Sequence, residues 1–76
     1  MDTKKFKKLA KEYMAENQRL TGGVVLIYEN KVYGWKDKLR DANHERPGVI
    51  AVDSDGYVFQ AQGGNDDDGA SHWVVL

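Results

Sequence analysis

Two groups of closely spaced aspartates are the side chains of this sequence that could bind a metal ion. Residues 53–56 read Asp-Ser-Asp-Gly, and Asp66, Asp67 and Asp68 are consecutive. Calcium prefers several carboxylate oxygens that converge on a tight, glycine-containing loop. The spacing does not match an EF-hand, because Gly56 directly follows the second aspartate and no acidic residue closes the loop near residues 62–64. We therefore predict a turn and a loop here, with no metal and no cofactor.

Nucleophilic catalysis is the other chemistry to consider, because Ser71 adjoins His72. A serine nucleophile needs a histidine base within hydrogen-bond reach and a third group that orients the base. Consecutive residues of a strand point to opposite faces of the sheet, so these two side chains are not expected to share a hydrogen bond. His44, the other histidine, lies in a polar stretch before Pro47. The sequence thus predicts a protein that is not an enzyme.

Charge is divided unequally along the chain. All 11 Lys and Arg residues precede Pro47, whereas residues 47–76 contain five Asp and no basic residue, although the net charge is only -1. The two halves must therefore present opposite electrostatic fields, which bears on binding partners more than on chemistry.

The acidic half favours a protein partner. Asp66, Asp67 and Asp68 would attract a basic surface and accelerate the encounter with it. Trp35 and Trp73 are expected to act as aromatic anchors, because tryptophan contributes strongly to binding energy at interfaces. We predict a small protein-binding module whose partner is not identified. An adaptor, an inhibitor or an accessory protein of a mobile element would fit its size.

The basic half supports an alternative, nucleic-acid binding. Lys4, Lys7, Lys8 and Lys11 recur at helical spacing and would line one exposed stripe that neutralises phosphates in a salt-dependent way. A solvated outer face is also what an amphipathic surface helix ordinarily shows, so nucleic acid is the second choice.

The element that carries these lysines is the clearest helix of the chain. Its apolar residues are Phe6, Leu9, Ala10, Tyr13 and Met14, whose spacing forms one stripe. Residues 24–28 (Val-Val-Leu-Ile-Tyr) predict a strand buried on both faces, and residues 32–35 return as its hairpin partner, with Asn30 able to take positive φ in the turn. A two-turn helix is expected within residues 36–46, with Trp35, Leu39 and Ala42 on one side, ending before Pro47.

The acidic half should consist of strands. Residues 49–52 and 57–61 flank the Asp-Ser-Asp-Gly turn as a second hairpin, residues 63–69 form a polar and flexible loop, and residues 72–76 form a last strand. The expected fold is α+β, with the N-terminal helix packed on an antiparallel sheet of four to five strands in the order α-β-β-(short α)-β-β-β. If the last strand lies at a sheet edge, it invites pairing with a peptide or with a second copy as a homodimer.

Length and composition limit the remaining possibilities. The 76 residues are expected to form a single domain, and they include no Cys for disulfide bonds. A core of this size supplies only about 3–5 kcal/mol, which makes self-association plausible. The longest apolar run, residues 24–28, is far shorter than the about 20 residues of a membrane span, so we expect no membrane association and a cytoplasmic location.

Overall fold

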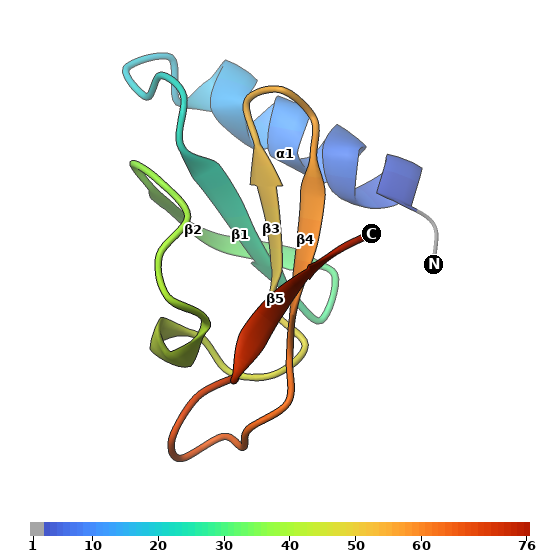
Figure 1. The fold of residues 1–76 in the computed structure, drawn as a ribbon. Helices are drawn as coiled ribbons and strands as arrows, with labels where there is room; N and C mark the ends of the chain where they lie inside the picture. Colours follow the sequence, from blue (N-terminus) through green and yellow to red (C-terminus); the bar gives the residue numbers. More distant parts are fainter. Residues whose placement is uncertain (1–2) are drawn as a thin grey trace.

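Residues 3–76, which the computed structural model describes, form one α-helix, one 3-10 turn and a five-stranded antiparallel sheet (Figure 1). The elements are α1 (Thr3–Glu16), β1 (Val24–Tyr28), β2 (Lys31–Lys36), η1 (Ala42–His44), β3 (Ile50–Asp53), β4 (Val58–Gln62) and β5 (His72–Val75). The strands lie in the order β2-β1-β3-β4-β5, so β2 and β5 are the two edges. The predicted fold class and element order are confirmed.

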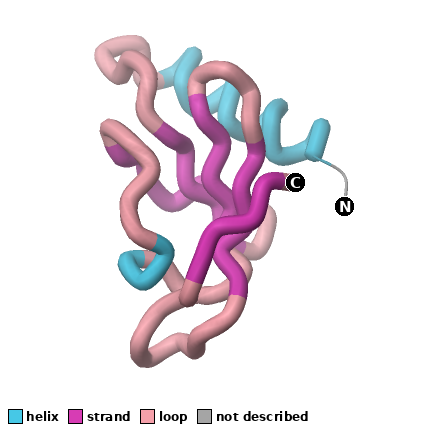
Figure 2. The backbone as a smooth tube through the Cα atoms, in the orientation of Figure 1, coloured by secondary structure: helices cyan, strands magenta, loops and turns pink. Residues whose placement is uncertain are grey.

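α1 lies across one face of the sheet (Figure 2). Phe6 and Ala10 of the predicted stripe are buried against alternate residues of the central strands, and Leu9, Tyr13 and Met14 pack around them. The strand residues in this cluster are Val25, Ile27, Ile50, Val52 and Val58. The helix therefore forms because its apolar face covers this side of the sheet, as its spacing predicted.

The opposite face has a core of its own. Val24 and Leu26 of β1 point to this side and pack with Val49 and with three small residues, Ala51, Ala61 and Ala70. Two connections between strands also contribute to this cluster: Leu39 and Ala42 come from the β2–β3 connection, and Ala70 comes from the β4–β5 connection. The first four residues of β1 are all buried, which confirms the prediction of a strand covered on both faces.

The segment between β2 and β3 differs from the expected two-turn helix. Its helical part is only the single 3-10 turn η1. The physical reason is that Trp35 belongs to β2 and packs with the core cluster that α1 covers, here called the α1 cluster, whereas Leu39 and Ala42 belong to the cluster on the other face. These three side chains cannot lie on one side of one helix, so the chain passes from one face to the other through bends and the single 3-10 turn.

A β-bulge interrupts the pairing of β1 with β2. Leu26 lies opposite Gly34 and Ile27 lies opposite Val32, so Tyr33 is the extra residue of β2. Such a bulge turns a side chain away from the face that regular alternation would give it. Val32 and Trp35 both pack against the α1 cluster, whereas the Tyr33 side chain is not part of it.

Both hairpin turns have the predicted form. Asn30 has a φ of 67° in the β1–β2 turn. In the β3–β4 turn the Asp53 carbonyl accepts from Gly56 N–H, and the Asp53 carboxylate oxygen Oδ1 accepts from the backbone N–H groups of Asp55 and Tyr57. The carboxylate of Asp53 thus serves the turn. No helix within residues 3–76 is long and apolar enough to cross a membrane.

Candidate functional site

The outer edge of β5 carries backbone groups that no other strand pairs. Leu76 N–H donates to Val58 C=O at 2.9 Å, and Gln60 lies opposite Val74. Because antiparallel strands alternate the direction of their hydrogen-bonding groups, residues 74 and 76 face β4, and the N–H and C=O groups of Trp73 and Val75 face outward. No backbone hydrogen bond from these two residues to a loop or turn occurs within residues 3–76.

Apolar side chains accompany this edge at the end where β5 finishes. Val75 is 62% exposed, and Tyr57, which precedes β4 by one residue, is 60% exposed. Val75 lies opposite Phe59, which is half-buried. The edge therefore combines unpaired backbone groups with exposed apolar side chains, the combination on which strand addition depends.

The three consecutive aspartates lie in a hydrogen-bonded turn just before β5. Asn65 and Gly69 exchange backbone hydrogen bonds of 3.1 and 2.9 Å, and Asn65 Oδ1 accepts from Asp68 N–H at 2.7 Å. Arg46 Nε is 3.8 Å from Asp66 Oδ1, whereas Asp67 makes no hydrogen bond or ion pair with another residue of 3–76. The expected loop is thus held in one shape by its own backbone, and its carboxylates remain exposed.

The acidic turn is fixed to the rest of the molecule at its base. Ala70 N–H donates to Glu45 C=O at 2.8 Å. Gly69 has a φ of +87°, and a Cβ at this position would lie 2.1 Å from the Asn43 carbonyl oxygen. This position therefore accepts only glycine, because the turn and the end of η1 pack backbone against backbone.

The two tryptophans do not form one surface. Trp35 packs with the α1 cluster and donates its indole N–H to Gly22 C=O at 3.0 Å. Trp73 packs with the cluster on the opposite face and donates to Arg40 C=O at 2.7 Å. Both indoles tie a loop to the sheet. Trp73 lies on β5, close to the acidic turn in the chain, whereas Trp35 lies on β2, the other edge.

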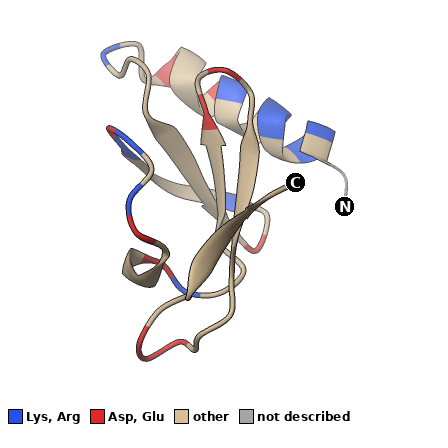
Figure 3. Ribbon diagram, viewed as in Figure 1, with Lys and Arg blue, Asp and Glu red and all other residues tan. Residues whose placement is uncertain are grey.

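The two acidic turns lie at opposite ends of the sheet, because β4 separates them (Figure 3). Asp53 and Ser54 line a cleft of about 380 Å³ together with Lys7 and Lys11 of α1. The four predicted lysines are exposed along α1, and two of them, Lys7 and Lys11, line this cleft together with Asp53. The loop between β4 and β5, which carries Asp66–Asp68, lies at the end of the molecule away from α1 in Figure 3.

Ser71 and His72 do share a hydrogen bond, contrary to the expectation from strand alternation. Ser71 Oγ is 2.8 Å from His72 Nδ1 and also donates to Gln62 C=O at 3.1 Å. The alternation rule does not apply, since β5 begins only at His72 and Ser71 lies in the bend before it. Both side chains are exposed, and no third residue orients the imidazole within residues 3–76. The pair therefore lacks the environment that activates a serine nucleophile.

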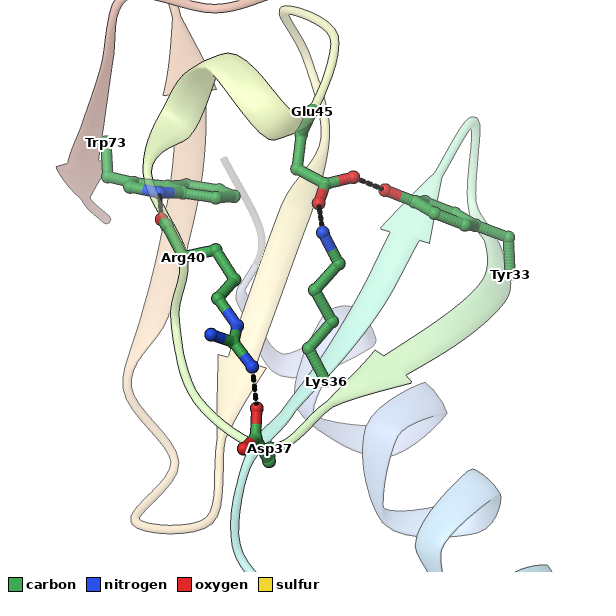
Figure 4. A network of polar contacts seen from close by, with 6 residues as sticks. All are labelled: Tyr33, Lys36, Asp37, Arg40, Glu45 and Trp73. Carbon is green, nitrogen blue, oxygen red and sulfur yellow. Dashed lines mark hydrogen bonds and ion pairs between the residues drawn. The ribbon is translucent and has the colours of Figure 1, made fainter.

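A network around Glu45 was not predicted. Glu45 is only 8% exposed, and its two carboxylate oxygens accept from Tyr33 Oη at 2.6 Å and from Lys36 Nζ (Figure 4). Both donors come from β2, whose bulge lets Val32 and Trp35 share the α1 face. Partial burial, followed by the hydrogen bond to Glu45 and its negative charge, raises the pKa of the Tyr33 phenol above the ordinary value. Nothing in the local sequence marks these residues, which lie 9 and 12 positions apart from Glu45.

The described residues contain no group of three or more His, Asp or Glu side chains placed to hold a metal ion. Comparison with known proteins adds no further assignment: the chain matches no protein-family model, no curated protein and no solved structure.

Proposed function

We propose that this protein is a small, non-enzymatic protein-binding module that pairs an extended segment of its partner with the free edge of β5. The observation that carries the proposal is the row of outward-facing backbone groups on Trp73 and Val75 beside the exposed Val75 and Tyr57 side chains. Main-chain hydrogen bonds would supply affinity, and alternate side chains of the partner would supply selectivity.

Charge along the edge defines the chemistry of the partner segment. The acidic turn comes directly before β5, and the far end of the edge is apolar. A partner segment with basic residues at one end and apolar residues at the other would match both the acidic turn and the apolar end of the β5 edge. Asp67, which has no partner within residues 3–76, is the carboxylate most available to such a segment.

The nucleic-acid alternative receives less support from the structure. Asp53 shares a cleft with Lys7 and Lys11, and its negative charge opposes phosphate binding beside these lysines. The role of Asp66, Asp67 and Asp68, together with Trp73, in protein binding therefore remains our first choice. Trp35 is on the other edge of the sheet and would not contact the same segment.

The test uses Val75, whose N–H faces outward. Val75→Pro removes that N–H, and proline is tolerated on an edge strand where the N–H faces solvent. Val75→Thr is the control, because threonine keeps the N–H and the β-branched side chain. A synthetic peptide of alternating valine and threonine with two terminal lysines is titrated into each protein, and amide exchange of Trp73, which all three proteins retain, is followed. Protection in the parent and in Val75→Thr but not in Val75→Pro supports the proposal.

Two results would count against the proposal. Equal binding of the peptide by the proline variant would show that the β5 edge is not used. A concentration-dependent dimer that dissociates in Val75→Pro would instead make a second copy the occupant of this edge, as a homodimer.

A further inference from the structure

A second cleft lies at the other edge of the sheet, between the β1–β2 hairpin and the segment that leads into β3. Its volume is about 470 Å³, within the range of about 300–1,000 Å³ in which proteins bind small molecules. The lining residues are Tyr28, Lys31, Tyr33, Glu45, Arg46 and Val49. This cleft is distinct from the β5 edge, since β2 and β5 are opposite edges of the sheet, although its lining residue Arg46 reaches Asp66 of the acidic turn at 3.8 Å.

The charges of this cleft do not balance. The carboxylate of Glu45 is already engaged by Lys36 and by the Tyr33 hydroxyl. The Lys31 side chain makes no hydrogen bond or ion pair with another residue of 3–76, and the only carboxylate that the Arg46 guanidinium pairs with among these residues is Asp66, at 3.8 Å. The cleft is thus lined by the Lys31 ammonium without a counter-charge within residues 3–76 and by the Arg46 guanidinium in a long, exposed ion pair, which favours an anionic ligand.

The walls of the cleft are aromatic. The Arg46 guanidinium lies 5.0 Å from the centre of the Tyr28 ring, so one ring already supports a cation. Tyr33 is 52% exposed, and its hydroxyl is bound to Glu45, which fixes the ring while leaving part of it open to solvent. Val49, which is almost fully buried, contributes an apolar side chain. A planar ring of a ligand could stack on Tyr33 without moving the side chain.

We propose that this cleft binds a nucleoside phosphate, with the base stacked on Tyr33 and the phosphate held by Lys31 and Arg46. Guanidinium and ammonium groups are the usual ligands of phosphate, and aromatic rings are the usual support for a base. The same chemical unit is present in a free nucleotide and at the end of a single-stranded nucleic acid. The inference does not depend on the protein-binding role of β5.

Titration of the ¹⁵N-labelled protein with AMP, adenosine, inorganic phosphate and a hexamer of deoxyadenylate tests the ligand class. We expect AMP to shift the backbone amides of Tyr33 and Arg46 and to bind at least tenfold more tightly than adenosine or inorganic phosphate. Stronger binding of the hexamer would identify a nucleic-acid end as the source, and equal binding would identify a free nucleotide. The absence of AMP-dependent shifts at millimolar concentration would overturn the proposal, as would phosphate binding as tightly as AMP.

Matched variants test the named residues. Arg46→Gln and Lys31→Gln should each weaken AMP by about 10- to 100-fold, the loss expected for a charge-assisted hydrogen bond. Lys38→Gln, on an exposed residue that does not line this cleft, should leave binding unchanged. Tyr33→Phe and Tyr33→Leu both remove the hydroxyl bound to Glu45, so a structural defect would affect both. Only Tyr33→Leu should lose affinity for AMP, because only leucine removes the aromatic face on which the base stacks. Equal loss in the two variants would contradict stacking.

Discussion

Tyr33 Oη donates a 2.6 Å hydrogen bond to Glu45 Oε1 and thereby joins the bulged residue of an edge strand to the segment that follows η1. The backbone of Glu45 also accepts from Ala70 N–H, so one residue connects β2, η1 and the loop before β5. Both proposed binding surfaces depend on this junction. Glu45 itself lines the cleft of Tyr28 and Arg46, and its carbonyl anchors the acidic turn.

Replacement of Glu45 by alanine should destabilise the protein by about 1–3 kcal/mol, because Tyr33 and Lys36 each lose a hydrogen-bond acceptor. Lys36 is partly exposed and can turn to water, which keeps the effect below that of a fully buried ion pair. Urea unfolding measures the change. Asp37→Ala, which breaks the exposed pair with Arg40, is the control and should cost about 0–1 kcal/mol. Equal losses of stability in Glu45→Ala and Asp37→Ala would show that the hydrogen bonds of Glu45 contribute no more than an exposed ion pair.

Alkaline titration should show a tyrosine with a raised pKa. Burial and Glu45 favour the protonated phenol of Tyr33 in the folded state, so its pKa lies above the about 10 of an unfolded chain. Above pH of about 10 the unfolded chain loses this proton first, and the contribution of Tyr33 to stability should fall as the pH rises further. Absorbance at the tyrosinate band follows the titration. Tyr33→Phe should remove the late step and make the alkaline loss of stability shallower, and a late step that persists in this variant would assign it to another tyrosine.

Gly69→Ala should destabilise the protein by about 2 kcal/mol or more, because its φ of +87° is unfavourable for alanine and the added Cβ would meet the Asn43 carbonyl. Gly34→Ala is the matched control, since a Cβ there meets nothing within 4 Å. Thermal unfolding of the two variants gives the comparison. If Gly69→Ala were as stable as Gly34→Ala, the acidic turn would not be packed against η1 as described.

Trp73→Phe should reduce stability by about 1 kcal/mol, the usual contribution of one hydrogen bond, because phenylalanine keeps an aromatic ring in the cluster and loses the donor to Arg40. Hydrogen exchange should show faster opening of residues 37–44, which this bond ties to β5. Trp35→Phe removes the corresponding bond to Gly22 and should loosen the α1–β1 connection instead. Identical exchange patterns in the two variants would rule out these separate roles.

The elements with a local signal were the ones that could be predicted. The spacing of Phe6, Ala10 and Tyr13 specified the face of α1, and Asn30 and residues 53–56 specified two turns, because backbone preference and amphipathic periodicity act over a few neighbouring residues. The two-turn helix expected within residues 36–46 was wrong, since an apolar spacing alone does not show that Trp35 and Leu39 belong to opposite faces of the sheet. The Ser71–His72 bond was missed because it depends on where β5 begins.

The sequence alone thus determined the N-terminal helix, the five strands and the two hairpin turns, and how charge is distributed between the two halves. Only the tertiary structure decided that Tyr33 is a bulge residue, that Glu45 binds side chains from β2, and that β5 is an edge with outward-facing backbone groups. The physical reason is that strand order and register depend on contacts between residues distant in the chain. A one-residue change in register moves a side chain to the other face, and no local pattern of this sequence encodes that choice.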